Sequence, residues 1–380
     1  MNVVVAIDSF KGSMTSMQAG ESAKKGIMYA YPDANVDVMP LADGGEGTVE
    51  ALVAGCGGEI NKVMVTGPLL DKVECEYGII ESMKTAIIEM SGAAGITLVS
   101  DNMRNPLKTT TYGVGEVIRD AIEKGCRNFV IGIGGSATND GGIGMLQALG
   151  FGMLNKDGKQ VSYGAEGLAE LQTITDDNVI KELRECTFTI ACDVNNPLCG
   201  EQGCSAIFGP QKGATPAMIM QMDKWLSYYA KLAKEKYPWA DAKYPGAGAA
   251  GGLGFAFRTF LKGELESGIS IVLRETKLEE HIKDADIVVT GEGRLDTQTV
   301  MGKAPAGVAE IAKKYNIPVI GVAGCVTKDA VACNAAGIDA YFPVLRTVVT
   351  LDEAMKTENA MQNMTDTVRQ IFNLIHSIRG

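Results

Sequence analysis

Short apolar runs and segments with helical spacing alternate at the start of the chain. The run Val3–Ile7 is apolar throughout and is followed by Asp8, the pattern of a parallel strand that is buried on both faces. Apolar side chains then recur at helical spacing over 15–31, and a second strand (36–40) and a second helix (46–54) follow. Strands that alternate with helices in this way predict a doubly wound α/β sheet.

The same alternation returns at the end of the chain. The expected elements there are a strand at 286–290, a helix at 305–315, a strand at 318–323, a helix at 329–336, a strand at 340–343 and a helix at 351–378. Together the two ends of the chain supply five parallel-type strands, which is enough for a flavodoxin-like sheet.

The middle of the chain begins with a different pattern. The strands expected at 60–65, 73–80 and 85–89 are joined by short turns and predict an antiparallel set. Alternation then resumes, with strands at 129–133 and 188–192 and helices at 112–124, 141–149, 216–237, 252–261 and 278–283. We therefore predict an α/β protein of two domains. A flavodoxin-like domain with a doubly wound parallel sheet (1–59 plus 285–380) receives an inserted mixed-sheet α/β domain (60–284), with the active site in the cleft between them.

Composition and charge disfavour some classes of binding partner. The 35 basic and 46 acidic residues give a formal net charge of −11, which disfavours nucleic acid, because phosphate backbones are bound by basic patches. No apolar run reaches the ~18 residues of a membrane span. The nine cysteines contain no C-x-x-C and the start shows no signal-peptide pattern, so we expect reduced thiols and a cytoplasmic location. A homodimer is left open.

Glycine is the unusual component, with 46 of 380 residues, well above a usual level of about 7%. In a packed α/β protein, glycine marks tight turns or places where backbone approaches a ligand. Two stretches carry such glycines just before expected helices. Residues 132–140 match the letters G-x-G-x-x-A of a dinucleotide fingerprint and offer backbone N–H groups to an anion. Residues 246–254 fit an anion loop and a close-packed hinge between domains equally well.

Acidic residues follow five of the expected strands. These are Asp8, Asp43, Asp140, Asp193, and Glu292 with Asp296. A single acid in this position is more often a helix cap or a turn former. Several converging carboxylates are costly unless a cation compensates them, and Mg²⁺ with a phosphate meets that need.

Glycine-flanked cations complete a set suited to phosphoryl transfer. They are Lys11, Lys212, Arg294 and Lys303, each of which taken singly fits an ordinary surface residue. Positioning and charge stabilisation supply nearly all of the catalysis in such transfers. The chain lacks the P-loop, protein-kinase and G-x-S-x-G motifs, and its two histidines (His281 and His376) are poorly placed, so a carboxylate base is preferred.

Seven segments together resemble the bacterial glycerate kinase family, type 1. They are DSFKGS at 8–13, PLADGGEGT at 40–48, GIGGSATNDGG at 132–142, GPQKGA at 209–214, GAAGGLGF at 248–255, TGEGRLDTQT at 290–299 and GKAPAGVA at 302–309. The resemblance implies ATP- and Mg²⁺-dependent phosphorylation of D-glycerate, typically to 2-phosphoglycerate. It also implies the two-domain fold predicted above. The alternatives kept open are 3-phosphoglycerate as product, an NAD(P)-dependent hydroxyacid dehydrogenase, and a non-catalytic nucleotide-binding module.

Chemistry suggests a role for each candidate residue. Lys11 and Ser13, backed by Asp8, are expected to contact the transferred phosphoryl group or the substrate carboxylate. Asp43, Glu46 and Glu292 are candidates for holding Mg²⁺, although Glu46 fits a first-turn acid of its own helix equally well. Gly134, Gly135, Ser136, Asn139, Gly251, Gly252 and Lys303 are candidates for the nucleotide phosphates. Asp193 is the first candidate for the base and Asp296 the second, while Arg294 is expected to clamp the glycerate carboxylate.

Overall fold

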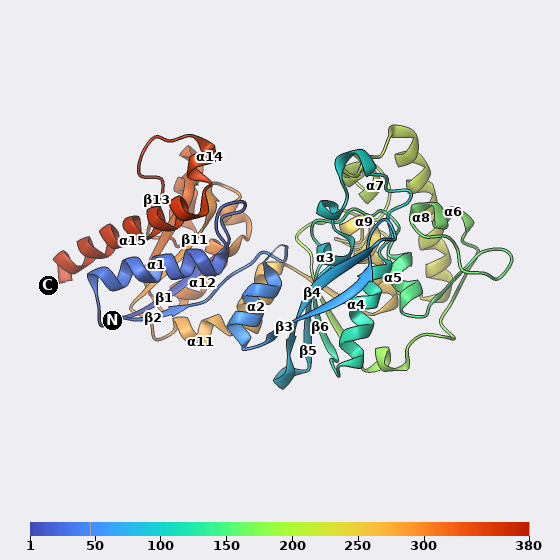
Figure 1. Cartoon of the computed structure of the whole chain (residues 1–380), viewed down its shortest axis with the longest axis horizontal. Helices are drawn as coiled ribbons and strands as arrows, with labels where there is room; N and C mark the ends of the chain where they lie inside the picture. Colours follow the sequence, from blue (N-terminus) through green and yellow to red (C-terminus); the bar gives the residue numbers. More distant parts are fainter. Residues whose placement is uncertain (46, 380) are drawn as a thin grey trace. The chain divides into compact units, whose positions relative to one another are not determined.

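A computed structural model describes residues 1–45 and 47–379, and its contacts group them into two compact units (Figure 1). The first unit comprises the described residues of Met1–Asp43, Glu50–Cys56 and Ile269–Gly380. The second unit comprises the described residues of Gly44–Val49 and Gly57–Gly268. Each unit has its own hydrophobic core and is described by itself.

The first unit is built on a five-stranded parallel sheet. Its order is β2 (Asn35–Val38), β1 (Asn2–Ile7), β11 (Ile287–Leu295), β12 (Val319–Val326) and β13 (Ala340–Pro343). Counted within the unit, this is the 2-1-3-4-5 order of a flavodoxin-like sheet. The predicted fold class is therefore confirmed, and the apolar run Val3–Ile7 is buried as its pattern requires.

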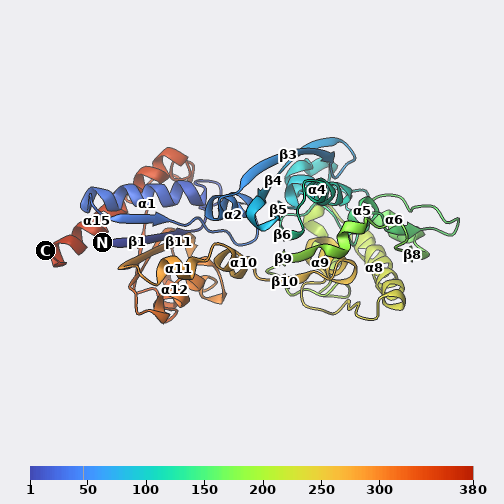
Figure 2. The ribbon, with the colours of Figure 1, turned by 90° about the horizontal axis from the view of Figure 1, so that it is seen from below.

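Helices cover both faces of this sheet. Helices α1 (Ser16–Ala30) and α15 (Thr357–Arg379) lie on one face, and α11 (Leu278–Ile282) and α12 (Ala304–Lys314) lie on the other (Figure 2). The start of α1 is set by a capping box, in which Thr15 accepts from the N–H of Gln18 and the Gln18 side chain accepts from the N–H of Thr15. Helix α2 (Thr48–Cys56) begins within the second unit, and its residues from Glu50 onward belong to the first.

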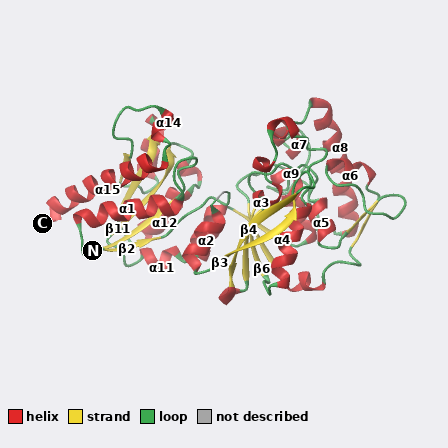
Figure 3. Cartoon of the chain, viewed as in Figure 1, coloured by secondary structure: helices red, strands yellow, loops and turns green. Residues whose placement is uncertain are grey.

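The second unit contains a six-stranded mixed sheet (Figure 3). Its order is β10 (Glu264–Glu266), β9 (Thr187–Ala191), β6 (Asn128–Gly132), β5 (Thr85–Glu89), β4 (Lys72–Ile80) and β3 (Glu59–Thr66). Strands β3, β4 and β5 pair antiparallel as predicted, and β5, β6, β9 and β10 are parallel. The carboxyl ends of the parallel strands therefore lie at one edge.

The remaining elements of the second unit surround this sheet. They are α3 (Ser91–Ala94), α4 (Tyr112–Glu123), α5 (Ile143–Ala148), the antiparallel strand pair of β7 (Gly152–Leu154) and β8 (Thr173–Thr175), α6 (Ala165–Glu170), α7 (Cys204–Phe208), α8 (Pro216–Lys236) and α9 (Ala249–Phe260). Among the described residues no helix is long and apolar enough to cross a membrane.

Several elements differ from the sequence-based expectation. Strand β11 continues to Leu295, and the helix expected at 351–378 is two helices, α14 (Leu351–Ala354) and α15. Helix α5 begins only at Ile143, because Gly141 and Gly142 have positive φ angles of 65° and 76° that interrupt a helix. Strands β7, β8 and β10 and helices α6 and α10 (Gly268–Glu275) were not predicted, since each is too short to show a clear period.

The predicted domain borders at 59–60 and 284–285 differ from the grouping of contacts. Residues 269–284 belong with the first unit. Helix α10 packs on α12 there, since the Cβ position of Gly307 lies 2.9 Å from the Leu273 side chain and 3.6 Å from that of Ile269. Glu279 on α11 also forms an ion pair with Lys314.

Candidate functional site

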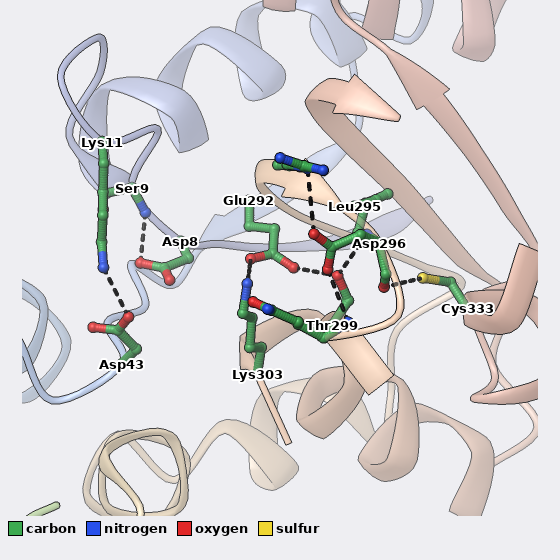
Figure 4. A network of polar contacts seen from close by, with 12 residues as sticks. Asp8, Ser9, Lys11, Asp43, Glu292, Leu295, Asp296, Thr299, Lys303 and Cys333 are labelled. Atoms are coloured by element: carbon green, nitrogen blue, oxygen red, sulfur yellow. Dashed lines mark hydrogen bonds and ion pairs between the residues drawn. The ribbon is translucent and has the colours of Figure 1, made fainter. Parts of the chain in front are cut away.

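The sheet topology brings two predicted acids together in the first unit. Strands β1 and β11 are parallel neighbours with Ile7 opposite Gly291, so Asp8 and Glu292 follow at the same edge (Figure 4). Asp43 lies in the same view and comes from the segment after β2. We call Asp8, Asp43 and Glu292 the carboxylate cluster.

Asp8 is the buried member of this cluster. Its side chain accepts a hydrogen bond from the N–H of Ser9 at 2.6 Å, and the residue is 7% exposed. Burial raises the pKa of this carboxyl to about 7, and the charges of Asp43 and Glu292 act in the same direction. Lys11 opposes the shift but does not cancel it. Asp8 thus sits where a proton or a cation is favoured near neutral pH.

Lys11 is directed toward Asp43 by a tight turn. The N–H and carbonyl of Phe10 bond to the carbonyl and N–H of Met14, and Gly12 takes a φ of 76° between them. The Lys11 ammonium donates to Asp43 at 3.0 Å, with both side chains well exposed. Exposed pairs of this kind contribute little stability, so the pair is free to open when a charged ligand arrives. Ser13 is half-buried in the same turn.

Glu292 is engaged on both of its oxygens. One accepts from the Thr299 hydroxyl at 2.6 Å, and the other faces the Lys303 ammonium at 3.3 Å (Figure 4). Burial raises the pKa of Glu292, while Thr299 and Lys303 lower it. The structure thus pairs a predicted Mg²⁺ ligand with Lys303, which was predicted as a phosphate-binding residue. Thr299 is a partner that the sequence-based reasoning missed, although it is the last residue of the matched segment 290–299.

Arg294 and Asp296 form a second pair at the end of β11. The Arg294 Nε lies 3.3 Å from an Asp296 oxygen, with the arginine side chain 64% exposed. The other Asp296 oxygen accepts from the N–H of Gln298 at 2.8 Å, which makes Asp296 a turn former. Arg294 therefore has an accessible guanidinium, whereas Asp296 is committed to its turn.

The acidic side chains can hold a metal ion only when other ligands complete its coordination shell. Among residues 1–45 and 47–379, no three His, Cys, Asp or Glu side chains form a preassembled metal site. Glu46, a predicted ligand, lies outside the described residues. Mg²⁺ is usually held by one or two carboxylates, with waters and substrate phosphates completing the shell. Asp8 and Asp43 suit that arrangement, because the charge of Asp43 adds to the effect of burial in raising the Asp8 pKa.

The second unit carries the other predicted residues on the segment 132–142, which we call the glycine loop. It follows β6 at the carboxyl edge of the sheet. Its carbonyl at Gly135 accepts from Ile96, and its N–H at Ala137 donates to Ala94. None of the described residues accepts from the N–H groups of Gly134, Gly135 or Ser136. Consecutive N–H groups without a protein acceptor are the kind of donors that bind anions in other loops.

The N-terminus of the helix that follows this loop already interacts with a carboxylate of the protein itself. Helix α5 has six residues and begins after Gly142, whose N–H donates to Asp140 at 3.1 Å. Asp140 also accepts from the N–H and hydroxyl of Thr111, both at 2.9 Å, and is fully buried. Asp140, one of the five strand-end acids, is therefore an internal cap. The amide of Asn139 is buried too and donates to Ser205 at 2.8 Å.

Gly251 and Gly252 pack against the glycine loop. Both have positive φ angles, and the N–H of Gly141 donates to the carbonyl of Gly251 at 2.9 Å. A Cβ at Gly251 would lie 2.1 Å from the Thr138 carbonyl oxygen. Both partners belong to the second unit, so these glycines serve close packing inside that unit. Their predicted contact with nucleotide stays a prediction.

This packing yields a stability prediction. Gly251→Ala should lower the free energy of unfolding by at least about 2 kcal/mol more than Gly158→Ala, because both add a left-handed alanine but only one also adds a clash. Gly158 has a φ of 73° with open space around its Cβ position. Urea unfolding of the two variants measures the difference. Equal losses would show that the 248–255 segment can move away from the glycine loop.

Asp193 lies in the second unit, just after β9. Its side chain accepts from the N–H of Gly268 at 3.1 Å, next to the position where Gly44 approaches both Ala191 and Gly268. The two segments through which the chain enters and leaves this unit are therefore in contact here. Glu89, at the end of β5, accepts from the N–H of Val49 and holds the entering segment. Sequence reasoning missed Glu89, although it shows the same signal of an acid after a buried strand.

The predicted residues thus form two sets. The first unit holds Asp8, Lys11, Ser13, Asp43, Glu292, Arg294, Asp296 and Lys303, and the second holds Gly134, Gly135, Ser136, Asn139, Asp193, Gly251 and Gly252. One set offers carboxylates and cations, and the other offers free backbone donors and a carboxylate. Phosphoryl transfer requires both kinds of group.

Comparison with known proteins agrees with this chemistry. A sequence model of the Glycerate kinase family matches residues 3–376. The chain is 48% identical to Glycerate 2-kinase of Escherichia coli over 94% of this chain and 93% of the relative, and 45% identical to Glycerate kinase of Haemophilus influenzae over 99% of both. A crystal structure described as glycerate kinase 2 from Salmonella typhimurium LT2 superimposes with a TM-score of 0.92 at 44% identity, covering 100% of this chain and 99% of that one. The chain therefore belongs to the glycerate kinase family.

Proposed function

We propose that the protein transfers the γ-phosphoryl group of ATP to the C2 hydroxyl of D-glycerate, giving 2-phosphoglycerate and ADP. The observation that carries the proposal is the match over nearly the whole chain to relatives named glycerate kinase, one of them Glycerate 2-kinase. The nine cysteines are all free thiols, which is typical of a reducing compartment, and we expect the enzyme to act in the cytoplasm.

The first-unit residues are suited to the transferred group and the substrate. The hydroxyl oxygen of glycerate attacks the γ-phosphorus while the bond to the β-phosphate bridging oxygen breaks. Lys11 would leave Asp43 to stabilise charge on the transferring oxygens, as an ammonium does in other kinases. The exposed Arg294 fork suits the glycerate carboxylate.

Asp8 and Asp43 are the residues we expect to hold Mg²⁺, with Glu292 less suited because Thr299 and Lys303 occupy its oxygens. A bound Mg²⁺ neutralises charge on the phosphates. Because a cation beside Asp8 favours its ionised form, binding of Mg²⁺ would lower the pKa of Asp8 from its raised value.

The second-unit residues are suited to the nucleotide and the proton. The free N–H groups of Gly134, Gly135 and Ser136 would bind a nucleotide phosphate. Asp193 remains the first candidate for the base that takes the hydroxyl proton. Asp296 is the weaker candidate, since one of its oxygens accepts from the N–H of Gln298 and the other is paired with Arg294.

The dehydrogenase alternative loses its structural support. A dinucleotide fingerprint needs a helix that starts within the glycine loop, with the pyrophosphate at the N-terminus of that helix. Here α5 starts at Ile143, and Asp140 already caps it. No observation favours hydride transfer.

The experiment is a coupled assay with purified enzyme, ATP, Mg²⁺ and D-glycerate. We expect glycerate-dependent ADP release and, when enolase alone is added, formation of phosphoenolpyruvate. Enolase uses 2-phosphoglycerate directly, so ADP release without phosphoenolpyruvate would establish phosphorylation at C3 instead. ATP binding without glycerate-dependent ADP release would indicate a binding module, and reduction of NAD by glycerate would indicate the dehydrogenase.

A further inference from the structure

A buried lysine lies directly behind the glycine loop. Lys212 ends the single 3₁₀ turn Pro210–Lys212 and is 2% exposed. Its ammonium donates to the Ser136 hydroxyl oxygen at 2.7 Å and to the Thr138 carbonyl at 2.6 Å. The turn is held in place by Gly213, whose φ is 88° and whose Cβ position lies 2.4 Å from the Arg104 carbonyl oxygen.

This ammonium has no carboxylate partner. Among the described residues, no Asp or Glu oxygen forms an ion pair with Lys212. The titratable groups that face it are the Cys204 thiol on α7 and Asp140 on the glycine loop, and both favour its charged form. Burial nevertheless lowers the pKa of Lys212 to about 8 and raises that of Cys204 to about 12. A buried cation is costly unless an anion compensates it.

The lysine decides what the Ser136 hydroxyl can do. Because its oxygen accepts from Lys212, the hydroxyl proton must point to a different acceptor. None of the described residues accepts that proton, and Ser136 is only 8% exposed to solvent. The proton therefore adds a fourth donor to the three free N–H groups of Gly134, Gly135 and Ser136.

We propose that Lys212 is a positioning residue for phosphate binding, which holds Ser136 as a hydrogen-bond donor and supplies the positive charge behind the glycine loop. The ligand is a phosphate group of a nucleoside di- or triphosphate. The proposal rests on the proposed function, in which this loop binds the nucleotide, and it gives a specific role to a lysine that the sequence analysis named among the cations without one.

The proposal has a pH signature. When Lys212 loses its proton, its nitrogen can accept from Ser136, so the hydroxyl turns away from the ligand and the charge disappears. Affinity for a fully ionised phosphate ligand should therefore fall as the pH rises through about 8. A purely structural lysine would not couple affinity to pH in this way.

The experiment measures ADP binding by calorimetry for the full-length protein and four variants. We expect Lys212→Met and Ser136→Ala each to weaken ADP at least about tenfold, as loss of a charge-assisted contact does. The double variant should be no more than about threefold weaker than Lys212→Met, because both changes remove the same donor. Lys231→Met, an exposed lysine on α8, is the matched control and should bind as the unmodified protein does.

The pH series supplies the second readout. Between about pH 7 and pH 9 the affinity of the unmodified protein for ADP should fall several-fold, whereas that of Lys212→Met should stay flat. Ser136→Ala should show a reduced dependence, which tests the proposal even if Lys212→Met does not fold. Weakened binding in Ser136→Ala with normal binding and a normal pH profile in Lys212→Met would overturn the role of Lys212 alone. Normal ADP binding in both variants would show that the nucleotide does not bind to this loop. That result would not contradict the proposed glycerate kinase activity.

Discussion

Asp8→Asn should make the protein more stable at pH 8 and lower its kcat/KM by about 100-fold or more. The buried Asp8 carboxyl has a pKa of about 7 in the folded protein, against 3.8 for a solvent-exposed aspartate. The unfolded chain therefore releases this proton more readily, and stability falls as the pH rises from about 4 to about 7. Asparagine never ionises and can still accept from Ser9, so it should recover on the order of 3 kcal/mol at pH 8.

The gain should depend on pH in a defined way. At about pH 3 this carboxyl is largely protonated in both states, so the variant and the unmodified protein should unfold at nearly equal urea concentrations. Asp33→Asn, an exposed acid before β2, is the control and should change stability by less than about 0.5 kcal/mol at either pH. A gain of the same size at both pH values would mean that it does not come from ionisation. Unchanged activity would remove Asp8 from the site.

The loss of activity has a separate physical reason. A neutral amide cannot compensate the charge of Mg²⁺ or respond to the phosphates as a carboxylate does. Stability gained together with activity lost is the usual sign of a group held in an unfavourable state for function. Measuring unfolding and kcat/KM on the same preparation tests both halves.

Asp193→Asn should lower kcat about 100-fold or more, with a smaller change in the KM for glycerate. General-base catalysis usually contributes about 10²–10⁴-fold. The substitution is suited to the test, because an asparagine oxygen can still accept from the N–H of Gly268 and preserve the contact between the two chain segments. Only the ability to take a proton is lost.

Asp296→Asn provides the comparison. Asp296 is paired with Arg294 and bonded to the N–H of Gln298, so its substitution should reduce kcat less than about tenfold. Steady-state kinetics of both variants at saturating ATP decides between the two acids. A loss of less than tenfold in Asp193→Asn together with a large loss in Asp296→Asn would reverse the assignment.

Much of the fold could be predicted from local pattern. A strand buried on both faces must be apolar along its length, which is why Val3–Ile7 and its counterparts are visible in the sequence. Short elements such as the strands β7 and β8 and helix α6 were not predicted, because three to six residues show too little of a period. The start of α5 was misplaced by two residues, since the left-handed glycines 141 and 142 belong to the loop.

The sequence predicts which residues belong to the candidate site better than it predicts which of them are in contact. Acids after parallel strands must meet at one edge of a sheet, so the proximity of Asp8 and Glu292 follows from topology. The same rule cannot separate a site residue from a cap. Asp140 follows a strand like the others, yet its oxygens are taken by Thr111 and Gly142 inside the second unit.

The sequence by itself determined the alternation of strands and helices, the acids and glycines at strand ends, and the family. These follow from short-range periodicity and from motifs that are read residue by residue. Only the tertiary structure decided that Lys303 faces Glu292, that Lys212 lies behind Ser136, and that burial moves the pKa values of Asp8 and Lys212 toward neutrality. The physical reason is that a partner or a dielectric environment is created by residues far apart in the chain, once packing has excluded water.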